Sequence, residues 1–214
     1  PPPRTPGSTS GVRIRIGQEK ITNMGNAAGF AIAFNEQVLL SRHRVDALTD
    51  DAVILIESKW ATHNNEKVVA EWNEAMEEMS AKNYRFIPVP MEAKTLEVVD
   101  NPKRGKNMFA LGILLWVYDR DVKIAKDQIA ATFAHKAPAI TEANHKLLDL
   151  GIEWAMENLD FRFRVPATPA TEELLVMNGN EALAMGAIAA GIELCAMYPI
   201  TPASSVSHYL GEVY

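Results

Sequence analysis

The sequence predicts an α/β fold: a Rossmann-like, mainly parallel sheet with C-terminal helices, followed by the start of a second α/β domain. Two observations predict this class. Short, uninterrupted apolar runs at residues 30–34 and 52–56 are typical of strands that are covered on both faces. Segments with helical spacing lie between these runs and after them, and this alternation favours parallel strands joined by crossover helices.

The composition is that of an ordinary globular protein and excludes several classes. Of the 214 residues, 48% are hydrophobic and 22% are charged, which excludes a disordered or collagen-like chain. The net charge of -6 comes from interleaved acids and bases, so no basic field is available to bind nucleic acid. The longest apolar stretch, residues 108–118, is about half the roughly 20 residues that cross a bilayer. Since no basic and apolar leader opens the chain, we expect a cytoplasmic protein without a membrane partner.

The sequence offers few metal ligands. Cys195 is the only cysteine, so one chain can neither form an internal disulfide nor hold an iron–sulfur cluster with several thiolates. The five histidines are scattered, without the close pairing of a helical zinc site. We therefore expect no metal site in this chain and any iron–sulfur cluster on a partner. Within its apolar stretch, Cys195 itself is expected to be a small buried hydrophobe.

The first domain is predicted over residues 12–165, after a flexible lead at residues 1–11 that is rich in Pro, Gly, Ser and Thr. Residues 12–16 alternate apolar and basic side chains, which is typical of a strand with one face in solvent. The other strands of this domain are predicted at residues 30–34, 52–56 and 85–90.

Apolar residues at helical spacing predict the helices of this domain. Residues 36–48 fit a crossover helix between two of the strands, and residues 67–80 place apolar side chains three and four positions apart. Three consecutive helices then close the domain, at residues 108–118, 122–133 and 139–159.

A domain boundary is predicted at residues 166–172, where two prolines among small residues disfavour regular structure. The remaining residues, 173–214, start afresh with a short apolar run and a helix at 181–191. A strand at 193–197 and a helix at 203–213 are expected next. So few elements cannot make a domain, and we expect this domain to be truncated.

The helix at 181–191 is crowded with small side chains. Ala182, Gly186 and Ala189 fall on one side of it, where another backbone can approach closely. Such a face suits a helix packed beneath a cofactor, and it equally suits ordinary close packing between protein segments. The composition leaves both interpretations open.

A rigid turn precedes the last helix and consists of Tyr198, Pro199, Ile200, Thr201 and Pro202. Each proline fixes its own backbone angle and pushes the preceding residue into an extended conformation, which holds Thr201 in place. A hydroxyl on such a turn can hydrogen-bond a substrate carbonyl or carboxylate, and the helix after it would present free backbone N–H groups to an anion. The alternative is that Thr201 and Ser204 only cap that helix.

Three segments of the second domain together resemble one known family. Residues 178–182, the Ala-Ala-Gly turn at 189–191 and residues 198–205 are similar to the start of the alpha subunit of 2-oxoacid:ferredoxin oxidoreductases. The resemblance implies that residues 173–214 are the N-terminal part of a pyrimidine-binding domain for thiamine diphosphate, with Thr201 facing the substrate. It also implies a pocket wall formed by Tyr198, Pro199, Ile200, Pro202, Ser204 and Ser205. Ala203 stands where many members have serine, so a hydrogen bond expected there is missing or comes from Ser204.

Residues 12 to about 160 resemble the gamma domain of the same enzymes, on weaker motifs at 33–36, 51–56, 106–112 and 150–153. Members normally begin with a glycine-rich strand-to-helix turn and an Arg-Gly-Gly segment, so we expect truncation at this end too. The glycines at 25 and 29 lead into a strand instead of a helix, and we interpret them as a turn and not as a nucleotide loop.

The resemblance implies a cytoplasmic, oxygen-sensitive enzyme that decarboxylates a 2-oxoacid with coenzyme A and passes two electrons, one at a time, to ferredoxin. Thiamine diphosphate with Mg²⁺ and an iron–sulfur cluster would be bound mostly by the beta subunit. The thiamine-activating glutamate of the family lies beyond Tyr214, so this chain alone is expected to be inactive. A gamma domain fused ahead of an alpha domain is more similar to the 2-oxoglutarate-type enzymes than to the pyruvate type.

Two other interpretations belong to different classes. The chain is alternatively a non-catalytic assembly module of the same complex, because its gamma domain has no convincing constellation of acid, base or nucleophile. A free-standing nucleotide-binding protein is disfavoured, because no glycine-rich loop leads from a strand into a helix.

Overall fold

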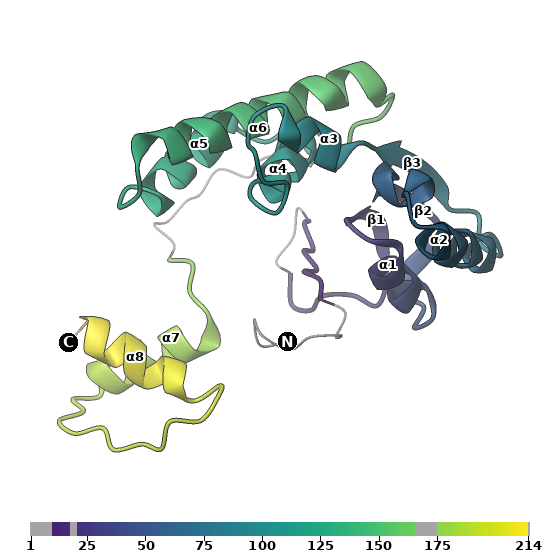
Figure 1. The fold of residues 1–214 in the computed structure, drawn as a ribbon. Helices are drawn as coiled ribbons and strands as arrows, with labels where there is room; N and C mark the ends of the chain where they lie inside the picture. Colours follow the sequence, from purple (N-terminus) through teal and green to yellow (C-terminus); the bar gives the residue numbers. More distant parts are fainter. Residues whose placement is uncertain (1–9, 18–20, 166–174, 214) are drawn as a thin grey trace. The chain divides into compact units, whose positions relative to one another are not determined.

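The computed structural model describes residues 10–17, 21–165 and 175–213. The chain divides into two compact units, Pro1–Ala167 and Thr168–Tyr214, each of which is described by itself (Figure 1). The predicted linker at residues 166–172 and most of the predicted lead at residues 1–11 lie outside the described residues.

A three-stranded parallel sheet forms the centre of the first unit, with the strand order β1-β2-β3. Ala31 of β1 pairs with Ile54 of β2, which pairs in turn with Phe86 of β3. The parallel sheet and these strands were predicted from the apolar runs, and the structure confirms them. The strands are β1 (Ala28–Ala33), β2 (Leu48–Glu57) and β3 (Arg85–Val89).

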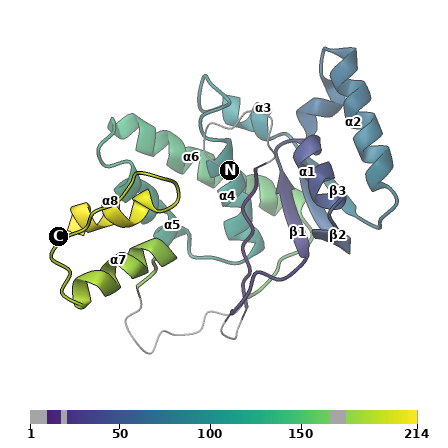
Figure 2. The ribbon, with the colours of Figure 1, turned by 90° about the horizontal axis from the view of Figure 1, so that it is seen from below.

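Helices cover both faces of the sheet (Figure 2). Because successive side chains of a strand point to opposite faces, neighbouring residues of β2 pack with different helices. Ile54 and Ile56 pack with α1 (Glu36–His43) and α2 (Glu66–Met79), whereas Leu55 packs with α4 (Lys106–Val117) and α6 (Pro138–Asn158). All three side chains are almost completely buried, which explains why β2 reads as a continuous apolar run. The crossover elements are α1 (Glu36–His43), η1 (Ser58–Thr62), which is a 3-10 helix, and α2 (Glu66–Met79).

The second helical layer contains the three consecutive helices that the periodicity predicted, and their existence is confirmed. Leu115, Ile129 and Leu148 form a small cluster where α4, α5 and α6 meet. A short helix ahead of them was missed, because six residues are too few to show a helical period. The helices are α3 (Met91–Leu96), α4 (Lys106–Val117), α5 (Val122–Thr132) and α6 (Pro138–Asn158).

Two predictions for the first unit need correction. Residues 12–16 form no strand: Val12 is 90% exposed and Ile14 71%, and the side chain of Arg13 donates a hydrogen bond of 2.9 Å to the Gly25 carbonyl in place of a backbone ladder. Alternation alone does not make a strand when no described strand pairs with it. The helix predicted at 36–48 ends at His43, because the chain turns there and enters β2.

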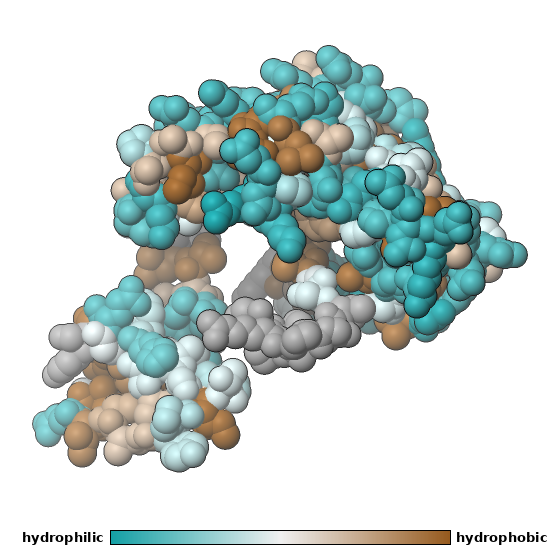
Figure 3. Space-filling view, viewed as in Figure 1, coloured by the Kyte–Doolittle hydropathy of each residue, from teal (hydrophilic) through white to brown (hydrophobic). Residues whose placement is uncertain are grey.

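The second unit contains two helices in its described residues, α7 (Gly179–Ala189) and α8 (Ser204–Val213), and both were predicted. Residues 193–197 form no strand, and Cys195 is exposed, so both of these predictions are wrong. Hydrophobic side chains reach the surface of this unit (Figure 3). Val176 and Leu194 are among the exposed hydrophobic residues. Ala184 is the only buried residue on α7 and α8, and residues 193–197 are exposed.

None of the helices within the described ranges is both long and apolar enough to cross a membrane.

Candidate active-site turn

The helix α7 begins in a capping box formed by Asn178 and Glu181. The Asn178 side chain accepts hydrogen bonds of 3.0 Å from the backbone N–H groups of Asn180 and Glu181. In return, the Glu181 carboxylate accepts a bond of 2.9 Å from the Asn178 N–H. Polar residues spaced three apart satisfy two otherwise free donors in this way, so the sequence at 178–181 fixes the start of the helix locally.

The side chain of Asn180 connects this helix to the proline-rich turn. Its Nδ2 donates to the Pro202 carbonyl at 3.0 Å and to the Ser205 Oγ at 2.6 Å. The Ser205 hydroxyl donates in turn to the Pro202 carbonyl at 2.9 Å. Asn180 is thereby joined to Pro202 and Ser205, which follow it by 22 and 25 positions, around the Pro202 carbonyl group.

Thr201 is exposed on this turn and immediately precedes Pro202. The peptide bond between the two residues is cis. On the other side of Thr201, the Ile200 carbonyl accepts a bond of 3.0 Å from the Ser204 N–H. The backbone is therefore held on both sides of Thr201, while its hydroxyl has no hydrogen-bond partner within residues 175–213.

The structure bears on two expectations about α8. The Thr201 hydroxyl makes no capping bond to this helix among the described residues, which speaks against a purely capping role. The expectation of free N–H groups at its start is wrong, because the amides of Ser204, Ser205 and Val206 donate to the carbonyls of residues 200, 202 and 203. An anion at this helix N-terminus would have to compete with those bonds.

The other predicted pocket residues surround Thr201 without enclosing it. Tyr198 is 79% exposed and Ile200 59%. Pro199, Pro202 and Ser205 are exposed as well, and Ser204 is partly buried. The turn is thus an exposed surface, and the side chain of Asn180 holds its backbone at Pro202.

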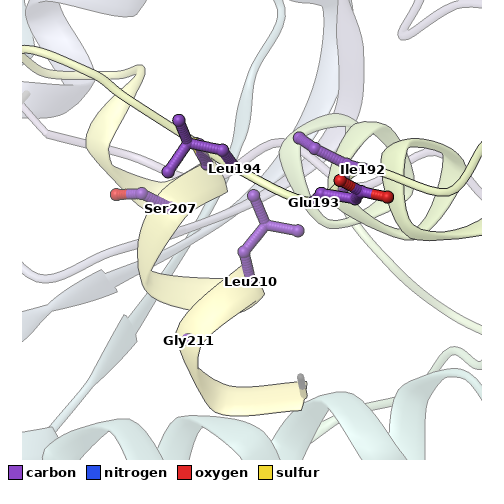
Figure 4. Close-up of a pocket in the computed structure, with 7 residues that line it drawn as sticks. Ile192, Glu193, Leu194, Ser207, Leu210 and Gly211 are labelled. Carbon is purple, nitrogen blue, oxygen red and sulfur yellow. The ribbon is translucent and has the colours of Figure 1, made fainter.

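A cavity of about 280 Å³ lies elsewhere in this unit, between α8 and the segment before the turn (Figure 4). Leu194 and Leu210 are among the residues that line it, and none of the predicted site residues does. Its walls are Ile192, Glu193, Leu194, Cys195, Ser207, Leu210 and Gly211.

The small-residue face of α7 is open to solvent. Ala182, Gly186 and Ala189 are exposed, and a Cβ added to Gly186 would meet no atom within 4 Å. In the described part of this unit nothing packs closely on that face, so both interpretations of it, cofactor support and protein packing, stay predictions.

A partly buried ionic cluster in the first unit was not predicted from the sequence. Glu57, the last residue of β2, is fully buried, and its carboxylate accepts hydrogen bonds from the backbone of Lys59 at 3.2 Å and of Glu92 at 2.9 Å. Lys59 and Lys106 place their ammonium groups 2.7 and 3.0 Å from the Glu92 carboxylate. Residues from three separate segments of the chain meet here, and the one sign of the cluster in the sequence is an acidic residue at the end of an apolar strand.

The charges of this cluster compensate one another. Partial burial raises the pKa of Glu92, but hydrogen bonds from the ammonium groups of Lys59 and Lys106 outweigh it, so the pKa of this carboxyl lies below its ordinary value. The carboxyl ends of parallel strands often bind ligands, but these four side chains already bind each other.

In the described ranges no three His, Cys, Asp or Glu side chains are placed to hold a metal ion.

Comparison with known proteins relates both units to one family. The family model described as pyruvate ferredoxin/flavodoxin oxidoreductase matches residues 2–154. The 2-oxoglutarate oxidoreductase subunit KorA of Mycobacterium tuberculosis is 30% identical over 95% of this chain and 33% of its own length. The 2-oxoacid:ferredoxin oxidoreductase 1 subunit alpha of Sulfurisphaera tokodaii is 25% identical over 82% of this chain and 29% of its own length.

A solved structure has a similar fold. It is the 2-oxoglutarate:ferredoxin oxidoreductase of Magnetococcus marinus with 2-oxoglutarate, coenzyme A and succinyl-CoA bound, at a TM-score of 0.72 and 22% identity over 91% of this chain and 31% of that one. The chain thus spans about a third of the length of these relatives. The family match confirms the resemblance seen in the sequence: this chain belongs to the pyruvate ferredoxin/flavodoxin oxidoreductase family.

Proposed function

We propose that this chain is part of the alpha subunit of an enzyme that oxidatively decarboxylates a 2-oxoacid with coenzyme A and reduces ferredoxin. The family match and the names of the relatives support this activity. We favour 2-oxoglutarate as the substrate, because the relative that covers 95% of this chain is named a 2-oxoglutarate oxidoreductase. Residues 12–165 are then the gamma-type domain, and residues 173–214 belong to the pyrimidine-binding domain, with residues 166–172 as the linker.

One observation carries the proposal: the Thr201 hydroxyl is exposed and unpartnered within the described residues, on a turn whose backbone is held on both sides. A donor that is already oriented stabilises charge developing on a substrate oxygen without reorganising during the reaction. Thr201 would donate to the keto oxygen of the 2-oxoacid. Tyr198, Pro199, Ile200, Pro202, Ser204 and Ser205 would form the wall beside it.

The turn fits one side of a shared cofactor site. When bound, thiamine diphosphate supplies the carbanion that adds to the keto carbon of a 2-oxoacid. The exposed turn would be one wall of this site, and a beta subunit would hold most of the diphosphate, the Mg²⁺ and the iron–sulfur cluster. The partners would then be that subunit, ferredoxin, coenzyme A and the 2-oxoacid, in the cytoplasm.

The self-paired cluster around Glu57 favours a second candidate function for the first unit. The Glu92 carboxylate pairs with both ammonium groups, and the Glu57 carboxylate lies 3.7 Å from that of Lys106, so these groups offer no free acid, base or nucleophile. The first unit would then serve as a non-catalytic module that binds neighbouring subunits.

The test uses the full-length alpha subunit that carries these residues, assembled with its beta subunit without oxygen. We expect ferredoxin reduction that requires coenzyme A and a 2-oxoacid, and that is faster with 2-oxoglutarate than with pyruvate. Full assembly of the complex without reduction by any of a panel of 2-oxoacids would refute the proposal. Deletion of the first unit that lowers the yield of assembled complex, while the complex that still forms turns over at the normal rate, would favour the second candidate for that unit.

A further inference from the structure

Asn180 is placed to control the turn that carries Thr201. It is the second residue of α7, and its own backbone N–H already donates to Asn178 in the capping box. Its side-chain amide is therefore not needed for the helix. Both bonds of its Nδ2 group go to the turn instead, one to the Pro202 carbonyl and one to the Ser205 hydroxyl. Two bonds from one amide group fix its orientation as well as its position.

Within residues 175–213, the bonds of Asn180 are the hydrogen bonds that tie this turn to α7. The Pro202 carbonyl also accepts from the hydroxyl of Ser205 at 2.9 Å and from its N–H at 3.4 Å, but both of these donors lie within three residues of it. Such local bonds shape the turn without fixing it against α7. Asn180 instead bonds to a carbonyl 22 positions later in the chain, that of Pro202, the residue next to Thr201.

We propose that Asn180 is a positioning residue that sets the direction of the Thr201 hydroxyl; this inference rests on the proposed function of Thr201. Asn180 does not touch the substrate. It holds the Pro202 peptide, and the position of that peptide determines where the neighbouring Thr201 side chain points. Because its partners are exposed, the loss of these bonds affects the geometry of the turn far more than the stability of the unit.

The kinetic test is a double-mutant cycle in the complete alpha–beta assembly. Asn180→Leu keeps a similar volume and removes both donors, and a misplaced Thr201 should lower kcat/KM by on the order of 10²-fold. Adding Asn180→Leu to Thr201→Val should change little, because a hydroxyl that is absent cannot be misplaced. If the kcat/KM losses of the two single variants multiply in the double variant, the two residues act separately and the inference is overturned.

Two serines on α8 provide a matched control. The hydroxyls of Ser205 and Ser207 each donate to a carbonyl three residues earlier at 2.9 Å, but only Ser205 also accepts from Asn180. Ser205→Ala should reproduce part of the Asn180→Leu loss, whereas Ser207→Ala should leave kcat/KM near that of the unmodified enzyme. Equal effects of the two alanines would contradict the inference.

A second readout does not depend on activity. In the same assembly without substrate, Asn180→Leu should speed hydrogen exchange at the amides of residues 204–206, with a nearly unchanged Tm, and Ser207→Ala should not. Unchanged exchange in the Asn180 variant would overturn the inference even if the unmodified enzyme oxidises 2-oxoacids. An unmodified assembly that oxidises none of them would instead refute the proposed function, whatever the exchange shows.

Discussion

A Cβ on Gly112 would lie 2.0 Å from the carbonyl oxygen of Leu148, so α4 and α6 touch through their backbones at this point. The contact is reciprocal, because a Cβ on Gly151 would lie 2.0 Å from the carbonyl oxygen of Phe109. The two helices cross with one glycine each at the crossing, and neither neighbouring atom belongs to a flexible side chain that could move aside.

Gly112→Ala should therefore destabilise the first unit. Overpacking of a core typically costs about 1 to 3 kcal/mol, and a clash with backbone atoms should reach the upper end of that range or exceed it. Urea unfolding measures the change. Gly29→Ala in β1 is the control, because its Cβ would lie 3.7 Å from the Thr49 hydroxyl, an ordinary contact. Equal stability of the two variants would show that the helices can separate at little cost.

Thr201→Val should separate the catalytic role of this residue from a capping role. Valine keeps the shape and removes the donor, so turnover of the complete enzyme should fall on the order of 10²- to 10³-fold if the hydroxyl acts in the transition state. A cap alone predicts a stability loss of about 1 kcal/mol with turnover nearly unchanged. Steady-state kinetics and thermal melting of the same preparation decide between them, and normal turnover with a lowered Tm would remove Thr201 from the active site.

The ion pairs of Glu92 should make the stability of the first unit depend on pH. Its pKa is lower in the folded chain than its ordinary value of 4.5, so ionised Glu92 stabilises the fold above that value. This contribution is lost as the pH falls from 4.5 through the lower folded pKa. Glu92→Gln should cost about 1 to 2 kcal/mol at neutral pH and little in acid.

Urea unfolding at neutral pH and in acid checks this prediction. Glu97→Gln is the control, because Glu97 directly follows α3 and, among the described residues, its half-exposed carboxylate pairs with Lys94 alone. A cost of Glu92→Gln that is the same in acid as at neutral pH would show that the charge of Glu92 does not stabilise the fold.

Limited proteolysis should cut first within residues 164–172. The prediction rests on composition, since two prolines among small residues supply neither apolar area nor regular hydrogen bonds. Mass spectrometry of the first fragments locates the cut. Early cleavage within residues 106–159, while residues 164–172 stay intact, would mean that the domain boundary is misplaced.

Local patterns were enough to predict most elements of this chain. The apolar runs in β1 and β2 and the helical spacing in α2, α4 and α6 depend only on neighbouring residues, and each matched the structure. The same reasoning was wrong at residues 12–16 and 193–197, where the pattern of a strand exists but no described strand pairs with it. A strand depends on a partner strand for its hydrogen bonds. Burial likewise depends on other segments that cover a side chain, so the apolar neighbours of Cys195 in the sequence were not enough to bury it.

The sequence by itself determined the three strands of the sheet, the longer helices and the family, because each depends on residue types at short spacing. Only the tertiary structure decided which distant groups meet. The glycines of α4 and α6, the ion pairs of Lys59 and Lys106 with Glu92, and the bonds of Asn180 to the turn all join segments far apart along the chain. Such contacts are set by the packing of whole elements, and no local pattern of residues encodes them.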